Sequence, residues 1–317
     1  MEQLLIENDY LRLTCLPYGA IIKQLEVKKN NEFKNVVIGY DQPDDYANNP
    51  LFYGASLGRY AGRIGNKGFS LQGQSYTLNH LENGVTLHGG QATFSHKSWS
   101  LDGIIKNSNP SITFSYNSND LEEGFPGNVK ATVTYQLLKN KLKISYKANT
   151  DKTTIINLAN HSYFNLDGEG SVLEHELELK SNQFLEVDEK QIPTGNFKEV
   201  NNTAFDFVQK RKIKDNNFKG VDDCFVMNNG KSCATLYSES SGIEMKVSTN
   251  QPGIVIFTPS EIEHKPYNNG AVFEKFPAIC FETQNYPDAP NHSHFPSAVL
   301  QPEDTYLNES TFEFNIK

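Results

Sequence analysis

Hydrophobic and polar residues alternate along much of this 317-residue chain. The alternation is clear in six segments: residues 111–116, 129–137, 142–146, 175–180, 245–247 and 312–316. Successive side chains of a β-strand point to opposite faces, so a period of two places one face in a core and the other toward water or a cleft. The pattern therefore predicts many half-buried strands.

The connections between these segments carry turn-forming residues. They include residues 124–127 (Gly-Phe-Pro-Gly) and the pairs Asp167-Gly168, Asn229-Gly230 and Asn269-Gly270. Helical periodicity never extends convincingly beyond two turns, and no linker, repeat or low-complexity tract divides the chain. We therefore predict an all-β fold, a large antiparallel β-sandwich that forms one domain over residues 1–317.

The composition limits which binding partners and which cellular compartment we expect. The net charge is −9 and no basic stripe is present, which argues against nucleic acid as a partner. The densest apolar runs, residues 158–166 and 254–258, are too short to cross a bilayer, and no secretory signal is visible. We expect a cytoplasmic protein that binds no membrane.

The cysteines are scattered and no pair has the spacing of a redox or zinc motif. In a long chain of this kind they are expected to be buried small hydrophobic residues, neither bridged nor bound to zinc. They are Cys15, Cys224, Cys233 and Cys280.

A histidine in a polar, aromatic-lined run is the first candidate for chemistry. His161 lies between Asn160 and Asn165, after an apolar strand-like segment. An imidazole in such a setting could carry a proton to or from a substrate near neutral pH. Alone, however, His161 is hardly better than a satisfied structural histidine, so a catalytic role needs a partner.

Glu282 is the candidate partner. It follows residues 277–281 (Pro-Ala-Ile-Cys-Phe), which are too apolar to be left exposed. Burying an unpaired carboxylate is costly, so Glu282 either has a partner or works as a base in a cleft. We favour the second interpretation.

Residues 58–66 are rich in glycine and arginine. Their spacing matches neither a dinucleotide-binding fingerprint nor a P-loop. From local sequence we favour a tight turn with two exposed arginines, Arg59 and Arg63. The alternative is an arginine at the rim of a polar ligand site, where its N–H groups bind hydroxyl oxygens.

Two further motifs are ambiguous locally. His88 precedes two glycines, which let backbone approach a ligand closely, and it is equally well a pocket residue or a loop histidine. Asp222 and Asp223 are neighbours before an apolar segment, so on a strand at most one of them enters a given pocket. His292 and His294 lack further ligands at suitable spacing and are assigned to a surface loop rather than a metal site.

Taken together and in order, these motifs resemble the aldose 1-epimerase (galactose mutarotase) family over essentially the whole chain. The resemblance is carried by residues 17–20 (Pro-Tyr-Gly-Ala), 58–64, 87–90 (Leu-His-Gly-Gly), 124–127, 160–166 (Asn-His-Ser-Tyr-Phe-Asn-Leu), 192–195 (Ile-Pro-Thr-Gly), 204–207 (Ala-Phe-Asp-Phe), 221–222, 282–290 (Glu-Thr-Gln-Asn-Tyr-Pro-Asp-Ala-Pro) and 295–297. Each motif is weak alone, but their number and order make chance an unsatisfactory explanation.

The resemblance implies a large β-sandwich with a sugar-binding cleft across one sheet, and an isomerase that interconverts the α and β anomers of free aldohexoses such as galactose and glucose. It implies no metal and no organic cofactor. By position, Glu282 matches the family's general base and His161 its general acid. His88 matches a supporting histidine near the ring oxygen, while Arg63 and Asp222 match residues that bind the sugar hydroxyls.

Two positions depart from the family pattern. Many members have Asn where this chain has Gly62, and many have a substrate-contacting Gln where it has Val255. Each change removes a polar contact, so the preferred sugar is in question rather than the reaction. Asp223 stands where another polar residue is common, which favours Asp222 for the binding role.

Three alternatives remain open from the sequence. An epimerase for hexose 6-phosphates would need a basic cluster, for which Arg59, Arg63 and Lys67 are available. A non-catalytic sugar-binding protein would bind without turnover. A glycoside hydrolase would need two flanking carboxylates, such as Glu282 and Asp222. The expected partner is a small monosaccharide, and the expected state is a monomer or homodimer.

Overall fold

The computed structural model describes residues 1–81, 83–215, 218–227 and 232–317. Three sheets dominate these residues, and every pairing between their strands is antiparallel. The predicted all-β antiparallel sandwich is thereby confirmed. The predicted turn at residues 229–230 lies outside the described residues.

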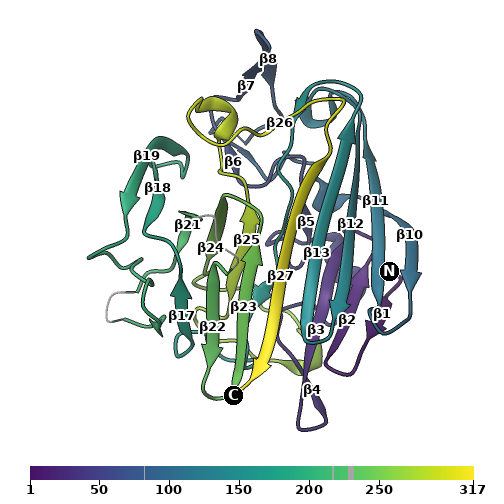
Figure 1. The fold of residues 1–317 in the computed structure, drawn as a ribbon, viewed down its shortest axis with the longest axis vertical. Helices are drawn as coiled ribbons and strands as arrows, with labels where there is room; N and C mark the ends of the chain where they lie inside the picture. The colour runs from purple at the N-terminus through teal and green to yellow at the C-terminus, as the bar shows by residue number, and fades with distance from the viewer. Residues whose placement is uncertain (82, 216–217, 228–231) are drawn as a thin grey trace.

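The largest sheet has nine strands and crosses the whole molecule (Figure 1). Its order is β10 (Ser100–Ile105), β11 (Ser111–Ser118), β12 (Val129–Leu138), β13 (Lys141–Thr150), β27 (Tyr306–Ile316), β23 (Ile243–Thr249), β22 (Ala234–Ser238), β17 (Glu176–Leu179) and β20 (Arg211–Lys212). All six alternating segments of the sequence lie in this sheet. Their apolar positions face the core, as strand geometry requires.

Two smaller sheets pack against the inner face of the nine-stranded sheet. One has the order β1 (Leu4–Glu7), β2 (Leu11–Leu16), β3 (Ile21–Lys29) and β4 (Glu32–Asn35). The other has the order β16 (Tyr163–Phe164), β25 (Ile279–Gln284), β24 (Gly253–Phe257), β21 (Asp222–Val226), β18 (Gln183–Val187) and β19 (Pro193–Glu199). One hydrophobic cluster draws side chains from all three sheets, so the core is continuous between the layers.

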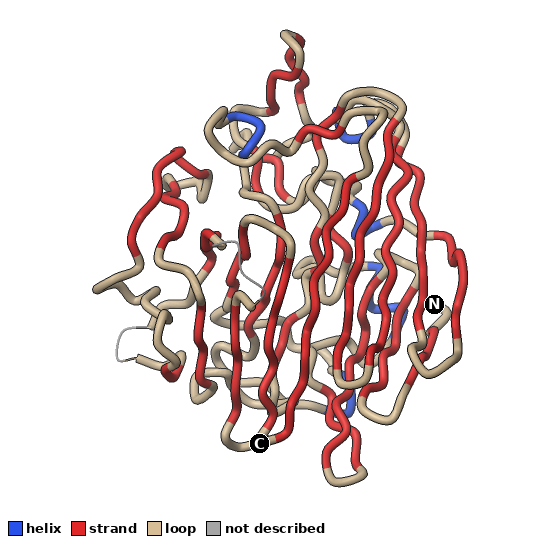
Figure 2. The backbone as a smooth tube through the Cα atoms, viewed as in Figure 1, coloured by secondary structure: helices blue, strands red, loops and turns tan. Residues whose placement is uncertain are grey.

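Short strand pairs and helices complete the fold, and the helices are the blue segments of Figure 2. The two-stranded pairs are β5 (Ser56–Leu57) with β15 (Ala159–Asn160), β6 (Arg63–Ile64) with β9 (Thr86–Leu87), β7 (Gly68–Leu71) with β8 (Gln74–Thr77), and β14 (Thr154–Ile155) with β26 (Val299–Leu300). The helices of the described residues are all short 3-10 turns, at Pro43–Ala47, Phe94–His96, Glu122–Gly124, Asn268–Gly270 and Ala289–Asn291. None of the described helices is long and apolar enough to span a membrane.

All four cysteines are buried and unbridged, as the sequence predicts. Cys15 belongs to the main core cluster, whereas Cys224 lies at the wall of a cavity. Cys280 is completely buried in β25. Each is therefore a small buried side chain, and the sulfurs of Cys233 and Cys280 also contact a polar group.

Candidate active site

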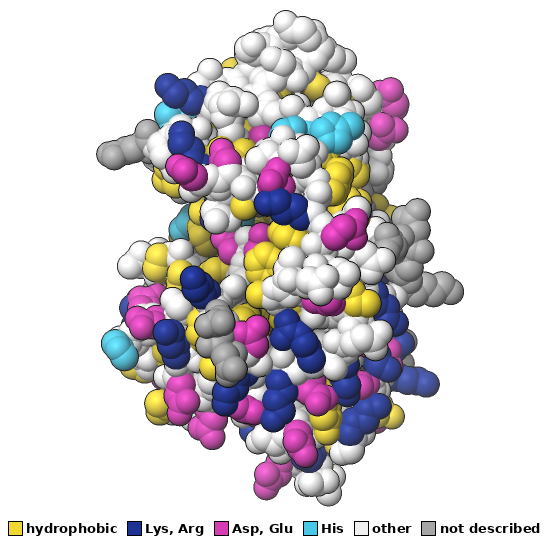
Figure 3. All heavy atoms as spheres, turned by 90° about the vertical axis from the view of Figure 1, so that its left-hand side faces the viewer, with side chains coloured by type: hydrophobic (Ala, Val, Ile, Leu, Met, Phe, Trp, Pro, Cys, Tyr) yellow, Lys and Arg dark blue, Asp and Glu magenta, His cyan; other side chains and the backbone are white. Residues whose placement is uncertain are grey.

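A cavity lies over the six-stranded sheet and encloses about 850 Å³ of space, its open mouth included. This is within the range of small-molecule sites. Strands β25, β24 and β21 form one wall, and the β18–β19 hairpin and the segments around β6 and β9 form others. Seen from the β18–β19 side, the molecule narrows at mid-height and exposes hydrophobic surface there, whereas charged side chains gather below (Figure 3).

Strand register arranges the wall residues in two rows. Glu282 pairs with Val255, and Val255 pairs with Cys224, so these three lie side by side across β25, β24 and β21. Phe257 and Asp222 pair with each other two residues further along the same strands. Because side chains repeat every two residues on a strand face, both rows face the cavity.

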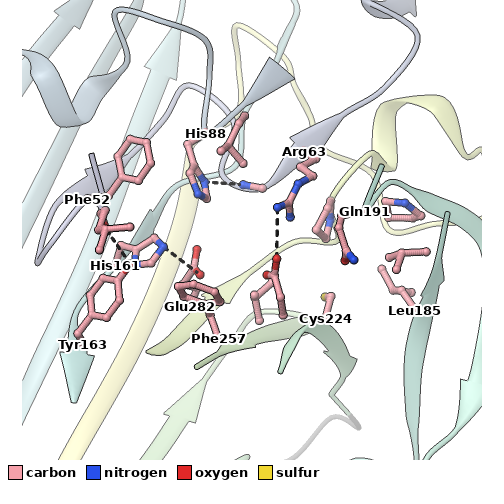
Figure 4. A pocket seen from close by; sticks show the side chains of 18 of the residues that line it. Phe52, Arg63, His88, His161, Tyr163, Leu185, Gln191, Cys224, Phe257 and Glu282 are labelled. Carbon is pink, nitrogen blue, oxygen red and sulfur yellow. Dashed lines mark hydrogen bonds and ion pairs between the residues drawn. The ribbon is translucent and has the colours of Figure 1, made fainter. Parts of the chain in front are cut away.

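His161 and Glu282 meet at one end of the cavity (Figure 4). Nε2 of His161 is 3.5 Å from Oε1 of Glu282, and both side chains are about 95% or more buried. The other carboxylate oxygen, Oε2, is buried without a hydrogen-bond partner in the described structure. A carboxylate with one oxygen toward an imidazole and one free oxygen has a position left for a substrate proton.

Burial shifts the pKa values of Glu282 and His161 in opposite directions. It raises the pKa of Glu282 to about 8, with Asp222 raising it further and Arg63 opposing the shift. It lowers the pKa of His161 to about 4. Near pH 7 these opposite shifts favour the carboxyl–imidazole form of the pair, which holds one proton. The carboxylate–imidazolium form differs from this one only by transfer of that proton to Nε2.

The ring of His161 is held firmly. Its backbone N–H donates to the carbonyl of Ala55, and its carbonyl accepts from the N–H of Gly54. The phenol ring of Tyr163 stacks against the imidazole, with centroids 4.9 Å apart and planes 21° apart. Sγ of Cys280 lies 3.6 Å from Nδ1. The ring is thus fixed with Nε2 toward Glu282.

His88 lies edge-on to His161, with ring centroids 5.5 Å apart. The backbone N–H of Gly62 donates to Nδ1 of His88 over 3.1 Å. Nδ1 is therefore the unprotonated nitrogen, and in the neutral ring Nε2 carries the hydrogen. Burial lowers the pKa of His88 well below its usual value, and the neighbouring His161 and Arg63 lower it further. His88 is thus a neutral hydrogen-bond donor rather than a second proton carrier.

Arg63 and Asp222 both line the cavity and form an ion pair with each other, which Figure 4 marks with a dashed line from Arg63. Nη2 of Arg63 donates to Oδ2 of Asp222 over 3.2 Å, and both side chains remain roughly one-third exposed. Arg63 lies in β6, and Asp222 begins β21. Asp222 lines the cavity whereas its neighbour Asp223 does not, as opposite faces of a strand require. The pair offers both donors and an acceptor to a ligand rich in hydroxyl groups.

The expectation of two exposed arginines in residues 58–66 is wrong. Arg59 is only 2% exposed, and its guanidinium donates to the carbonyls of Phe125, Pro126 and Gly127. It is a structural residue that joins two loops. The alternative interpretation, an arginine at the rim of a ligand site, applies to Arg63.

The five residues selected from the sequence, namely Arg63, His88, His161, Asp222 and Glu282, all line this one cavity. So do Gly62 and Val255, the two positions that depart from the family pattern. Other lining residues were missed. Phe257 is two positions beyond Val255 on the same strand face and could have been found from that spacing. Phe52, Leu185 and Gln191 come from separate segments and carry no such signal.

Three ligand-type atoms converge in the cavity. Atoms of His88, His161 and Glu282 lie within 4.8 Å of one another, and these residue types can hold a metal ion. The expectation that the protein needs no metal stays a prediction. His292 and His294 lie elsewhere and donate ring N–H groups to the carbonyls of Pro193 and Gly195.

Comparison with known proteins gives consistent matches over the full length. The sequence model of a family described as aldose 1-epimerase matches residues 2–313. Galactose mutarotase from Sus scrofa is 36% identical, covering 100% of this chain and 94% of the relative. Aldose 1-epimerase from Escherichia coli (strain K12) is 31% identical, covering 97% and 93%.

Solved structures agree. A GalM/aldose epimerase homologue from C. elegans superposes with a TM-score of 0.92 at 30% identity, covering 99% of both chains. Galactose 1-epimerase from Lactobacillus acidophilus NCFM superposes with a TM-score of 0.88 at 25% identity, covering 99% of this chain and 94% of that one.

Proposed function

The chain belongs to the aldose 1-epimerase family and is an isomerase, and on that premise we propose that Glu282 and His161 are the base and acid of its reaction. That reaction interconverts the α and β anomers of free aldohexoses such as galactose and glucose. The observation that carries the assignment is the buried 3.5 Å contact between His161 and Glu282 in the cavity that holds the Arg63–Asp222 pair.

Ring opening needs two proton transfers on opposite sides of one bond. Glu282 as carboxylate takes the proton of the C1 hydroxyl, and Nε2 of His161 gives its proton to the ring oxygen. The C1–O5 bond then breaks to an open-chain aldehyde. After rotation about C1–C2, the carbonyl presents its other face, and the two groups exchange roles to close the ring as the other anomer. Each positioned proton transfer contributes about 10² to 10⁴ in rate.

The remaining polar residues orient the sugar. His88 donates Nε2–H toward the ring-oxygen side and stays neutral, which spares the imidazolium of His161 an adjacent positive charge. Arg63 and Asp222 bind hydroxyl groups of the ring and of the open chain. Gly62 and Val255 remove side-chain polar contacts from the same wall, so they bear on which sugar is preferred.

Free sugars fit this cavity better than sugar phosphates do. Arg63 is the only lysine or arginine among the described lining residues, and it is already paired with Asp222. Arg59 is committed to backbone carbonyls outside the cavity. A phosphate would need a free cluster of cations. Turnover of glucose compared with glucose 6-phosphate distinguishes the two substrates, and hydrolysis of a nitrophenyl galactoside would instead indicate a glycosidase.

The wider biology is proposed from the same premises. Residues 1–317 act as one domain, a proposal supported by the core cluster that is common to the three large sheets. The protein is cytoplasmic, a monomer or homodimer, and takes a monosaccharide as its partner without nucleic acid, membrane or cofactor. Light scattering with and without galactose tests the oligomeric state.

The acid–base assignment predicts large losses of activity without loss of fold. Glu282→Gln and His161→Asn should each slow mutarotation of freshly dissolved α-D-galactose or α-D-glucose by about 10² to 10⁴, measured by polarimetry. Glu303→Gln and His294→Asn make the same chemical changes at exposed positions outside the cavity and should be neutral. Near-normal turnover by either cavity variant would contradict the assignment.

A further inference from the structure

Cys280 contacts the ring of His161 but does not line the cavity. Its Sγ is 3.6 Å from Nδ1 of His161, and both side chains are buried. Cys280 lies in β25, two residues before Glu282, and pairs in register with Tyr163 of β16. In the described structure no other residue forms a hydrogen bond with the His161 ring nitrogens besides the contact to Glu282.

The sulfur of Cys280 therefore faces Nδ1, whereas Nε2 faces the carboxyl of Glu282. The proton that Nε2 and Glu282 exchange lies on one of these two groups. When it lies on Glu282, Nε2 is the acceptor and the hydrogen of the neutral ring is on Nδ1; when it lies on Nε2, the ring is an imidazolium and Nδ1 carries a hydrogen as well. In both forms Nδ1 is a donor, and a thiol sulfur is a weak acceptor.

We propose that Cys280 is a positioning residue for catalysis, whose sulfur accepts the Nδ1 proton of His161 and so reserves Nε2 for proton exchange with Glu282 and the sugar. The proposal rests on the acid role of His161 given above. In both one-proton forms of the pair, the mobile proton lies along the line from Nε2 to Oε1 of Glu282. Nδ1–H stays in place in both forms, so no tautomer change interrupts the reaction.

An uncharged partner suits an acid that must release its proton. A carboxylate at Nδ1 would stabilise the imidazolium and make Nε2–H a weaker acid. Burial raises the pKa of the Cys280 thiol well above its usual value, and nearby Glu282 and Asp222 raise it further, so Cys280 stays neutral. The sulfur thus orients the ring without holding its charge.

The other groups around His161 are consistent with Nδ1 bonding to Cys280 and Nε2 exchanging the proton. The titratable ones are Glu282 at Nε2, His88 at the ring edge and Tyr163 stacked on the ring, and Phe52 and Phe257 complete the surroundings. Burial raises the pKa of Tyr163 well above its usual value and lowers that of His88, so both stay neutral. Cys280 is the only side chain in this set that contacts Nδ1.

The first test compares Cys280→Ala with Cys280→Ser. Loss of the acceptor should lower kcat for galactose mutarotation by about tenfold, with KM within about twofold, and should move the acid limb of the pH–rate profile to lower pH. The serine hydroxyl should restore kcat to within about threefold of wild type. Cys15→Ala is the matched control, because Cys15 is equally buried but lies in the core.

The second test reads the ring directly. Long-range ¹H–¹⁵N spectra of His161 at pH 6.5 should place the hydrogen on Nδ1 in the wild-type protein and give a mixture of tautomers in Cys280→Ala. A bare Nδ1 in wild type overturns the proposal. So does a Cys280→Ala variant that loses only stability, as Cys15→Ala does, with kcat and the pH profile unchanged.

Failure of the underlying function is separate from failure of this proposal. If His161→Asn retains full turnover, the acid role itself is wrong, whatever Cys280 does. If His161→Asn is inactive while the Cys280 variants match wild type in rate, pH profile and ring spectrum, only the positioning role is lost.

Discussion

The two large sheets of this protein use their second faces differently. In the nine-stranded sheet, alternate residues of β12 are buried while the residues between them meet solvent. In the six-stranded sheet, all six residues of β25 are buried, because one face looks into the core and the other into the cavity. The nine-stranded sheet therefore has a solvent-exposed outer face, whereas the six-stranded sheet carries polar side chains that are buried on both of its faces.

A polar side chain on β25 must therefore find a protein partner or serve a ligand. Thr283 faces inward and forms a hydrogen bond with the hydroxyl of Ser310 over 2.6 Å. The amide nitrogen of Gln284 donates to the carbonyl of Asn285. Glu282 is left with a buried oxygen that has no described partner. Oε1 of Gln284 also lacks a described partner, but Glu282 lines the cavity and Gln284 does not, so burial and position at the cavity together point to Glu282.

The largest effect should come from separating the two sheets. Phe312 of β27 is 2% exposed, and its ring stacks on Phe164 of β16 with centroids 5.2 Å apart. Phe312→Ala should lower the free energy of unfolding by about 3–5 kcal/mol, measured by urea denaturation. Leu307→Ala, on the exposed part of the same strand, should change it little. A loss under 1 kcal/mol for Phe312→Ala would mean that this inter-sheet contact is not part of the stabilising core.

Removing the buried carboxyl of Glu282 should instead raise the free energy of unfolding at alkaline pH. Below about pH 4, Glu282 is protonated in both the folded and the unfolded chain. As pH rises toward 8, the unfolded chain ionises this group while the folded protein keeps it protonated, so the free energy of unfolding falls. Glu282→Gln lacks this penalty and should be more stable than wild type at pH 8, by on the order of a few kcal/mol.

Denaturation at pH 4 and pH 8 measures this difference. The advantage of Glu282→Gln should vanish at pH 4, where the wild-type carboxyl is neutral as well. Exposed Glu303→Gln should give no advantage at either pH. Equal stability of wild type and Glu282→Gln at pH 8 would show that the carboxyl is not held at a raised pKa.

A smaller effect, on KM, should follow from replacing Arg63, the arginine proposed to bind sugar hydroxyl groups. Arg63→Lys keeps the positive charge opposite Asp222 but loses the planar guanidinium that can donate two parallel bonds. KM for galactose should rise about tenfold and kcat should fall less, measured from initial polarimetric rates. Arg12→Lys, at an ion pair with Glu7 outside the cavity, is the control. An unchanged KM would remove Arg63 from substrate binding.

The smallest effect should come from removing an ion pair on the solvent-exposed face of the nine-stranded sheet. Nζ of Lys143 is 2.6 Å from Oε1 of Glu309, and both side chains are about one-third exposed. Exposed pairs contribute about 0.2–1 kcal/mol, so Lys143→Ala should cost less than about 1 kcal/mol of unfolding free energy and none of the activity. A loss above 2 kcal/mol would contradict the contrast between the two sheets.

The two sheets also differ in how well their strands can be predicted from the sequence. Every alternating segment found in the sequence belongs to the nine-stranded sheet, because only a strand with one wet face alternates. Strand β24 is buried on both sides and reads as a short apolar run, which periodicity does not assign to a face. Strand β25 is completely buried as well, but its second half is polar (Glu282, Thr283, Gln284), so its sequence does not alternate either. The arginines of residues 58–66 show the same limit, since burial of Arg59 depends on carbonyls from residues 125–127.

The sequence alone determined the fold class, the family resemblance and the five polar residues that line the cavity. These rest on local patterns and on residue types at fixed spacings, which the chain carries without folding. Only the tertiary structure decided that Nε2 of His161 faces Glu282, that Gly62 fixes the tautomer of His88, and that Cys280 lies behind His161. Those relations join segments up to 121 residues apart in the chain, and a proton responds to distances and burial that exist only once these segments are packed together.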